Sequence, residues 1–319
     1  MSDAINHRWN HPAVILVATD LNDLDRLIPF AFQQVAATGA RLILLHVIVP
    51  GSALTVDSSG LPAYNPMVAL EFASKVLDPW CEMARSKNIV CDALLREGNV
   101  AEQIATSARQ FSADRLLLGT RSKGKLERLF LGSVAEQVLR SVYLPVMTVG
   151  PEAHLPLAND HPERVVLHAT TLREASRPSA ALACQIAASQ GAKLLLLHVL
   201  PPIDEPVSEF HRKGLPTGLD SAAMYELDLL AKEAGANCCT AVETYVVHGN
   251  PAIEILSEAV ERHASLIVLG ATQHSALQNL TRDRVVYRVL AHARCPVLTL
   301  GEPQSSMLAA QSESIATHS

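Results

Sequence analysis

A loop rich in basic residues leads to a glycine–serine pair in the first half of the chain. It contains Arg121, Lys123, Lys125 and Arg128, and it is followed by Gly132 and Ser133. Glycine allows another backbone group to approach closely, and serine can cap a helix that begins there. The free N–H groups at a helix N-terminus bind anions such as phosphate, and nearby cations favour the same ligand. These residues therefore predict a polyphosphate-binding site.

The same stretch matches the opening of a P-loop, which has the pattern G-x-x-x-x-G-K-[ST]. Gly119, Gly124 and Lys125 fit the pattern, but Leu126 offers no hydroxyl group to Mg²⁺. A P-loop also passes directly into a helix, whereas the best helix start in this stretch comes later, at Gly132. A true P-loop is therefore disfavoured.

Two histidines, His46 and His198, end two similar apolar runs and raise the question of a metal or acid–base role. A histidine that bonds to backbone is the favoured interpretation, and no histidine pair shows ligand spacing supported by cysteine or carboxylate neighbours. We predict no metal site. The cysteines show no C-x-x-C spacing and are expected to be free thiols in a reducing compartment; they are Cys81, Cys91, Cys184, Cys238, Cys239 and Cys295.

The composition excludes several classes of protein. The 319 residues are 49% hydrophobic and 18% charged, which predicts aliphatic cores and excludes disorder as the main state. A net charge of −6 without a long basic run disfavours nucleic-acid binding. No apolar stretch is long enough to span a bilayer or to serve as a signal sequence. A cytoplasmic protein is expected.

An internal repeat organises the chain. The run that ends at His46-Val47 recurs 152 positions later, and three further motifs recur 151 positions later. The matching motifs are Gly98-Asn99 with Gly249-Asn250, Leu118-Gly119 with Leu269-Gly270, and Pro145-Val146 with Pro296-Val297. A tandem duplication of two domains follows. We expect one domain over residues 1–150, a linker over 151–161, a second domain over 162–301 and a mobile tail over 302–319.

Strands and helices are predicted to alternate in the first copy. Strands are expected over 14–19, 41–48, 89–96, 115–118 and 145–149, and helices over 24–38, 68–87, 100–110 and 133–141. Continuous apolar strands between helices indicate a mostly parallel sheet covered on both faces, so each copy should be a five-stranded α/β domain. Such sheets bind ligands at the carboxyl ends of their strands. Asp20, Val47 and Gly119 lie at or just past three of these ends.

The first copy resembles the universal stress protein family, whose nucleotide-binding members carry G-x2-G-x9-G-[ST] after the fourth strand. Here the pattern reads Gly119-x2-Ser122-x9-Gly132-Ser133. The resemblance implies two tandem Rossmann-like domains of the adenine nucleotide alpha hydrolase type, with ATP, with or without Mg²⁺, in the first. Asp20 and the Val47 backbone would frame adenine and ribose, while Gly119, Gly132 and Ser133 would hold phosphates. Ser122 replaces the second glycine, so its side chain either crowds the ligand or adds a donor.

The second copy departs further from this pattern. Thr171 stands opposite Asp20, Gln273 opposite Ser122, Asp283 opposite Gly132 and Arg284 opposite Ser133, whereas Gly270 matches Gly119. An aspartate at a helix N-terminus would occupy the place of a phosphate and repel it. We therefore expect no triphosphate in this half. Its predicted role is structural, as the pseudo-dimer partner of the first copy, or the binding of a less anionic ligand.

Two functions remain open. The first is a stress protein in which ATP acts as a regulatory ligand, with no catalytic residues and at most slow ATP hydrolysis. The alternative is a nucleotide-independent interaction protein that dimerises through its last strands, 145–149 and 296–300. Asp20 could equally cap the following helix. The long loops 50–66 and 201–220 could cover the ligand cleft or meet across a pseudo-twofold axis. A monomer and a homodimer are both open.

Overall fold

The computed structural model describes residues 9, 11–51, 54–56, 62–120, 131–142, 144–154, 164–172, 176–202, 218–236, 238–272 and 284–301. We call the described residues up to 154 the N-terminal half and those from 164 the C-terminal half. Among the described residues, no helix is both long and apolar enough to cross a lipid bilayer.

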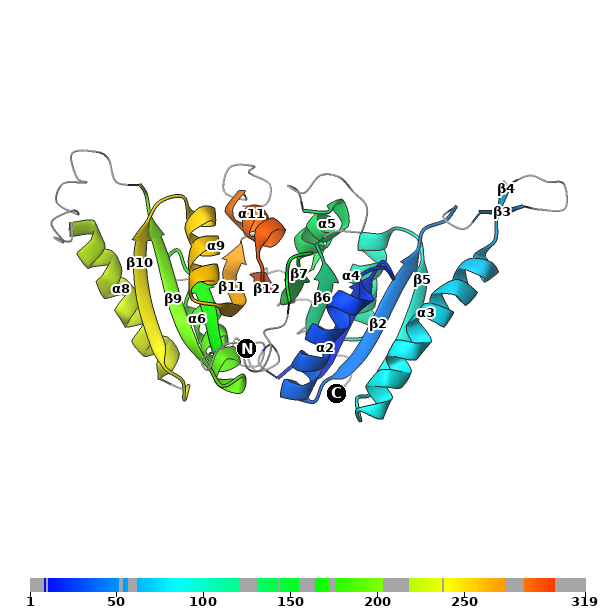
Figure 1. The fold of residues 1–319 in the computed structure, drawn as a ribbon, viewed down its shortest axis with the longest axis horizontal. Helices are drawn as coiled ribbons and strands as arrows, with labels where there is room; N and C mark the ends of the chain where they lie inside the picture. The colour runs from blue at the N-terminus through cyan, green and yellow to red at the C-terminus, as the bar shows by residue number, and fades with distance from the viewer. Residues whose placement is uncertain are drawn as a thin grey trace, which may run out of the picture.

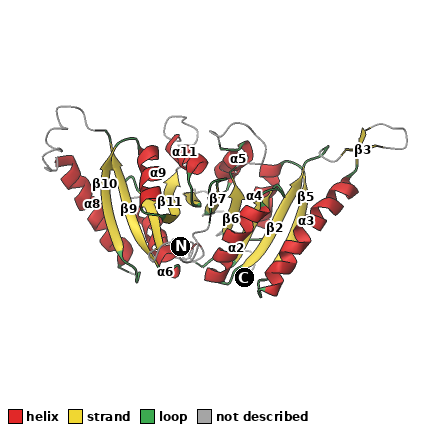
Figure 2. Cartoon of the chain, viewed as in Figure 1, coloured by secondary structure: helices red, strands yellow, loops and turns green. Residues whose placement is uncertain are grey.

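The N-terminal half alternates strands and helices as predicted (Figures 1 and 2). Its main strands are β1 (Val14–Thr19), β2 (Arg41–Ile48), β5 (Cys91–Glu97), β6 (Arg115–Gly119) and β7 (Val146–Val149). Its helices are α2 (Leu24–Thr38), α3 (Pro66–Ser86), α4 (Val100–Gln110) and α5 (Ser133–Ser141).

The largest boundary differences from the prediction in this half are two residues, at the starts of α3 and β5; the other differences are one residue. Helix α3 begins at Pro66 rather than at residue 68, because proline suits the first helical position and Asn65 caps the helix. Strand β5 begins at Cys91 rather than at residue 89, because the Ile89 N–H closes the end of α3 on the Ala84 carbonyl at 3.0 Å.

A small hairpin lies in the stretch that was predicted to be only a loop. Strands β3 (Leu54–Val56) and β4 (Pro62–Tyr64) pair antiparallel between β2 and α3. The loop prediction for residues 50–66 was therefore wrong for these two strands, which are too short to show a periodic pattern.

The C-terminal half repeats the arrangement. Its strands are β8 (Arg164–Ala169), β9 (Ala192–Leu200), β10 (Val242–His248), β11 (Ala264–Thr272) and β12 (Val297–Gly301). Its helices are α6 (Ser176–Ser189), α8 (Gly218–Gly235), α9 (Pro251–Glu261) and α11 (Arg284–His292). Unusual backbone conformations recur at the repeat spacing: φ is 71° at Leu21 and 58° at Leu172, and 49° at Ser112 and 50° at His263. The duplication therefore preserved local backbone geometry.

The main strands form one ten-stranded sheet in the order β10-β9-β8-β11-β12-β7-β6-β1-β2-β5, which runs from one end of the molecule to the other (Figure 1). Each half contributes five parallel strands, as predicted. The two halves meet where β12 and β7 pair antiparallel. The sheet is therefore continuous through the repeat.

The junction between β7 and β12 is nearly symmetric. Thr148 lies opposite Val297, and Thr299 lies opposite Val146. The Thr148 hydroxyl donates to the Val297 carbonyl at 3.3 Å, and the Thr299 hydroxyl donates to the Val146 carbonyl at 3.2 Å. The last strands thus occupy each other's edges within one chain. The alternative in which these strands pair with another molecule was therefore wrong, because β7 and β12 are each paired on both sides within the chain.

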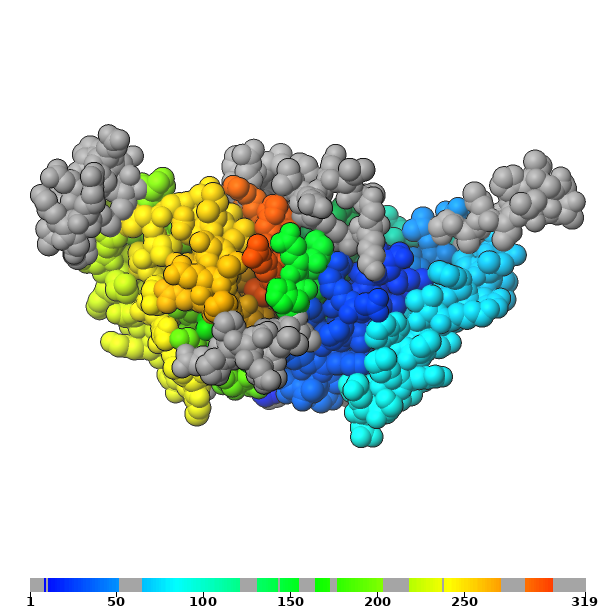
Figure 3. All heavy atoms as spheres, viewed as in Figure 1, coloured from blue at the N-terminus to red at the C-terminus, as the bar shows by residue number. Residues whose placement is uncertain are grey.

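The cores also join the halves. One buried cluster on one face of the sheet includes side chains of α2, α3, α6 and α8, and therefore spans both halves. The other face has one cluster with α4 and α5 and another with α9 and α11. Leu131 and Leu139 pack against both of these clusters. In Figure 3 the green middle of the chain meets the orange C-terminal part without a break.

Candidate functional site

The strand order of the N-terminal half reverses direction between β1 and β6. From β1 the chain proceeds to β2 and β5 on one side, whereas β6 and β7 lie on the other. Open parallel sheets bind ligands outside the carboxyl ends of the strands at such a switch point. The ends of β1 and β6 therefore mark the candidate site.

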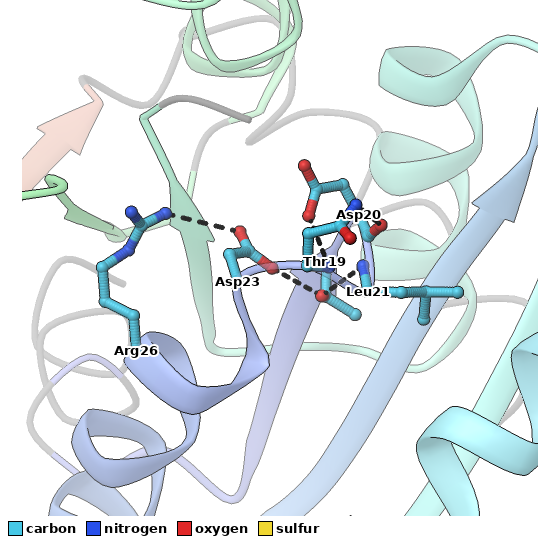
Figure 4. Close-up of polar contacts among 6 residues, drawn as sticks. Thr19, Asp20, Leu21, Asp23 and Arg26 are labelled. Carbon is cyan, nitrogen blue, oxygen red and sulfur yellow. Dashed lines mark hydrogen bonds and ion pairs between the residues drawn. The ribbon is translucent and has the colours of Figure 1, made fainter. Parts of the chain in front are cut away.

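A tight turn follows β1 at this point (Figure 4). The Leu21 N–H donates to the Thr19 hydroxyl at 2.9 Å, and the Asn22 N–H donates to Asp20 Oδ1 at 2.9 Å. Asp20 is partly exposed, and it lies before the helix, whose N-cap position is taken by Asp23. The interpretation of Asp20 as the helix cap was therefore wrong, because its carboxylate stabilises the turn instead.

The carboxylate of Asp23 is unusual because it is buried and has a raised pKa. Its side chain is 5% exposed, accepts a hydrogen bond from the Thr19 hydroxyl at 2.6 Å, and lies 3.7 Å from Arg26 Nη2 (Figure 4). Burial raises the pKa of Asp23 to about 6, although the Thr19 hydrogen bond opposes that rise. Asp20 raises the pKa further by charge repulsion, and Arg26 lowers it. The sequence analysis did not identify this group.

Gly119 ends β6 directly against the Asp23–Arg26 pair. A Cβ atom at this position would lie 2.5 Å from Asp23 Oδ2 and 2.8 Å from Arg26 Nη2. These separations are too short for non-bonded atoms. Glycine at this strand end therefore leaves room for two charged side chains, from the N-cap and the first turn of α2, to reach the switch point.

Gly132 is equally constrained at the start of α5. Its N–H donates to the Thr120 carbonyl at 2.9 Å, and a Cβ atom on Gly132 would lie 2.9 Å from that same oxygen. Ser133, the first residue of the helix, is exposed. The helix N-terminus is thereby fixed close to the end of β6.

The helix starts differ in how they are capped. Asn65, Asn99 and Asn250 accept hydrogen bonds from the first turns of α3, α4 and α9. By contrast, no side chain among the described residues caps α2 or α5, and these are the helices that begin beside the ends of β1 and β6. The first N–H groups of an uncapped helix need another acceptor, and an anion can supply it.

Val47 lies just past the ladder between β1 and β2, whose last pair is Thr19 with His46. The Ile48 carbonyl points to the β5 side, where it accepts from the Gly98 N–H at 3.0 Å. Since successive residues of a strand direct their backbone groups to opposite sides, those of Val47 face the rim beyond the end of β1. This is the orientation that its predicted role requires.

Thr120 is a further polar residue of the site that the sequence analysis missed. It follows Gly119, it is 1% exposed, and its hydroxyl has no hydrogen-bond partner among the described residues. A threonine between two site residues carries no signal of its own in a sequence.

Several predicted residues lie outside the described part of the chain. They include Ser122, the cations from Arg121 to Arg128, Gln273 and Asp283. Arg284 is described only as the first residue of α11. The predictions for these side chains stay predictions.

The corresponding strand end in the C-terminal half keeps the turn but changes the chemistry. The Leu172 N–H donates to the Thr170 hydroxyl at 3.1 Å, as in the first copy. Gly270 faces Ser179, whose Oγ would lie 3.0 Å from an added Cβ atom. The Ser179 hydroxyl contacts Nε2 of His168 at 3.3 Å, and both side chains are buried.

His46 and His198 bond to backbone, as favoured. Nδ1 of His46 contacts the Thr19 carbonyl at 2.9 Å, and Nδ1 of His198 contacts the Thr170 carbonyl at 2.9 Å. They brace equivalent strand ends. Within the described ranges, no group of three His, Cys, Asp or Glu side chains could hold a metal ion.

Comparisons with known proteins agree with the repeat. The family model described as "Universal stress protein family" matches residues 13–150 and again residues 163–300. A universal stress protein from Thermus aquaticus is 35% identical over 138 residues, which cover 42% of this chain and 96% of the relative. One from Mycolicibacterium smegmatis is 24% identical over 303 residues, covering 90% and 96%. The crystal structure of a universal stress protein from Archaeoglobus fulgidus has the same fold, with a TM-score of 0.69 at 18% identity, covering 91% of this chain and 99% of that one.

Proposed function

This chain belongs to the universal stress protein family as a tandem two-domain member, and from that premise we propose that its N-terminal half binds ATP as a regulatory ligand. One observation carries the proposal. Within the described part of the chain, the helices α2 and α5 start without a side-chain cap beside the switch point, whereas α3, α4 and α9 are capped by asparagine side chains. A bound polyphosphate would supply the missing acceptors.

The ligand would be held by residues from four elements. Asp20 and the Val47 backbone would frame adenine and ribose at the ends of β1 and β2. Gly119, Gly132 and Ser133 would hold the phosphates at the end of β6 and the start of α5, with Ser122 beside them. Mg²⁺ would arrive with the nucleotide, bound to its phosphate oxygens.

The role proposed is binding without efficient turnover, with at most slow ATP hydrolysis. Both described carboxylates at the switch point are engaged within the protein, Asp23 by Thr19 and Arg26 and Asp20 by the Asn22 N–H. Arg26 adds positive charge close to Gly119, where a phosphate would lie. The bound nucleotide would then act on conformation or on partner binding.

The C-terminal half is proposed to be the structural counterpart of the first, in an intramolecular pseudo-dimer joined through β7 and β12. We also propose the division into residues 1–150, a linker over 151–161, 162–301 and a tail over 302–319, in a cytoplasmic protein. The β7–β12 pairing and the shared core support a single working unit.

Calorimetric titration of ATP with Mg²⁺ into nucleotide-free protein tests the proposal. Wild type should bind about one ATP per chain. Gly132→Asp should lower the affinity at least about 100-fold, because its Cβ atom would displace the Thr120 carbonyl and its carboxylate would repel the phosphates. Gly218→Asp is the matched control, since it adds an aspartate at the start of α8, where a Cβ atom meets nothing within 4 Å. It should bind like wild type.

Two results would overturn the proposal. One is the absence of binding heat in folded wild type, which would favour a nucleotide-independent interaction protein. The other is an equal loss of affinity in both variants, which would show that the added charge acts from a distance. Light scattering on the same samples reports whether the whole chain forms a homodimer.

A further inference from the structure

Two cysteine side chains meet beneath the outer helix of the N-terminal half. Cys81 lies in α3 and Cys91 is the first residue of β5, the edge strand that α3 covers. The Cys91 thiol donates a hydrogen bond to the Cys81 sulfur, and the two Sγ atoms are 3.1 Å apart. Their exposures are only 1% and 2%, and both are free thiols.

The two thiols are chemically unequal. The hydrogen bond from Cys91 lowers the pKa of the Cys81 thiol, and the charge of Arg85 lowers it further, against the opposing effect of burial. The same hydrogen bond and burial raise the pKa of Cys91. Arg85 is held in place one turn after Cys81, where its Nη2 donates to the Cys91 carbonyl at 3.0 Å. Cys81 is therefore the thiol that ionises first, and the thiolate is the reactive form.

The local helix can open to admit a small oxidant. Pro79 lies inside α3, two residues before Cys81, and its missing N–H leaves the helix without one hydrogen bond there. The helix lies over an edge strand at one end of the molecule (Figure 1). Local opening of such a peripheral segment costs less than global unfolding. Closing the sulfurs to a disulfide bond, about 2.05 Å, needs a movement of about 1 Å.

The fold itself does not require these thiols. Helix α8, the counterpart of α3, contains no cysteine, and Val242 stands opposite Cys91 at the repeat spacing. The same helix and edge strand therefore form in the C-terminal half without a thiol pair. The thiol contact between this helix and this edge strand thus belongs to the N-terminal half. In the C-terminal half, the Cys238 thiol instead donates to the Cys184 carbonyl of α6, at 2.9 Å.

We propose that Cys81 and Cys91 are a site of reversible oxidation, at which hydrogen peroxide converts the two thiols to a disulfide between α3 and β5. The Cys81 thiolate attacks one oxygen of hydrogen peroxide, and the O–O bond breaks. Cys81 becomes a sulfenic acid, and the departing hydroxide takes up one proton and leaves as water. The Cys91 sulfur then attacks the Cys81 sulfur, and the S–O bond breaks to release a second water molecule. Two thiols are oxidised, one peroxide is reduced to two water molecules, and a dithiol reductant reverses the change.

Mass spectrometry of the full-length protein tests this site. Reduced protein is treated with one equivalent of hydrogen peroxide, blocked with iodoacetamide and digested with trypsin. Cleavage after Lys75, Arg85, Lys87 and Arg96 places the two cysteines in separate peptides, 76–85 and 88–96. We expect these peptides to be joined, with the loss of two hydrogen atoms, and dithiothreitol should separate them.

Single-cysteine variants sharpen the result. Cys91→Ser should leave a sulfenic acid on Cys81 that dimedone traps, whereas Cys81→Ser should leave Cys91 unreacted. Cys239→Ser is the matched control, because Cys239 is an exposed free thiol outside the pair, and its loss should not change the yield of joined peptides. Recovery of both peptides fully alkylated, while Cys239 is oxidised in wild type, would overturn the proposal.

Discussion

The two halves have the same backbone fold, but their side chains differ at the switch point. Beside Gly119 the N-terminal half brings in the charged pair Asp23 and Arg26, whereas beside Gly270 the C-terminal half buries the neutral pair His168 and Ser179. The β1 turn and the β8 turn nevertheless have the same hydrogen bond to a threonine hydroxyl. Turn geometry is thus set by the fold, while the side chains around it are free to change chemistry.

The arginines at the repeat spacing show the same divergence. Arg26 lies against the strand end in the N-terminal half. Its counterpart Arg177 is exposed and pairs with Glu233 on α8, at 3.4 Å. The positive charge that would attract a phosphate at one switch point is directed to the surface at the other.

The largest expected effect comes from converting the buried pair of the C-terminal half to that of the N-terminal half. Val17 and Ile28 stand at the positions of His168 and Ser179, and they are fully buried. Either single change, His168→Val or Ser179→Ile, should lower the free energy of unfolding by about 1–3 kcal/mol, because each breaks the buried contact between the Ser179 hydroxyl and His168 Nε2. The double variant should recover most of that loss. Urea denaturation of the wild type, the two single variants and the double variant measures these free energies. A loss in the double variant equal to the sum of the two single losses would contradict the prediction.

Acid should separate the same variants. Burial lowers the pKa of His168 to about 4, and its Nδ1–H donates to the Val268 carbonyl at 2.9 Å. A histidine with a lowered pKa stabilises the fold above its ordinary pKa, and that stability is lost as the pH falls toward 4. Between pH 6.5 and about pH 4, the free energy of unfolding of the wild type should therefore fall by up to about 3 kcal/mol more than that of the double variant.

Gly119→Ala and Gly270→Ala should differ in their effect on ATP. The added Cβ atom at Gly119 would displace Asp23 and break its bond with Thr19, so ATP affinity should fall about tenfold or more. At Gly270 the atom nearest to the added Cβ is Ser179 Oγ, at 3.0 Å, and ATP affinity should not change. Calorimetric titration compares them, and equal losses would remove the distinction between the halves.

ATP binding should also depend on the charge of Asp23. Because burial raises the pKa of Asp23 to about 6, its carboxylate gains a proton between neutral and mildly acidic pH. Loss of that negative charge beside Arg26 should improve ATP affinity a few-fold. Titrations of the wild type and Asp23→Asn over the same pH range cancel the protonation of ATP itself. The affinity ratio should approach a constant value below about pH 5, and a ratio independent of pH would contradict the role of Asp23.

The smallest effect is expected at the end of edge strand β10. His248 Nδ1 faces the Pro201 carbonyl at 2.9 Å and Nε2 faces Asp220 at 2.5 Å, whereas Glu97 stands at the same position in the N-terminal half. Partial burial lowers the pKa of His248, but these two acceptors outweigh it and raise the pKa overall. The resulting stability is present at low pH and is lost as the pH rises through the raised pKa.

Thermal unfolding of the wild type and His248→Gln checks this sign. The difference in the free energy of unfolding between the two proteins should be less than about 1 kcal/mol near pH 6, because a partly exposed ion pair contributes little. It should shrink toward zero near pH 8.5, where the ring loses its proton. A difference that grows with pH would show that the neutral ring is the stabilising form.

The sequence was sufficient for the elements and insufficient for the charges at the site. Helices 24–38, 100–110 and 133–141 were predicted at their observed bounds, because the periodic apolar pattern and Gly39 mark their limits. The contact between Asp23 and Gly119 joins residues far apart in the chain, so no local pattern reports it. Asp20 was identified from its place just past a predicted strand and from the resemblance to the family.

The junction of the two halves shows a different limit. The sequence indicated that 145–149 and 296–300 are strands able to pair at their edges. It could not distinguish pairing within one chain from pairing between two chains, because both use the same hydrogen bonds. Only the three-dimensional arrangement of β7 against β12 decides between them.

The antiparallel pairing of β7 with β12 within one chain determines how a substitution affects the two sides of the junction. When two identical chains join through one surface, every substitution appears on both sides of the symmetry axis. In this molecule the two sides are encoded separately, so a substitution alters one side alone. The linker also keeps the partners together at any dilution. One copy can therefore lose or change its ligand while the other retains it, without any risk that they part.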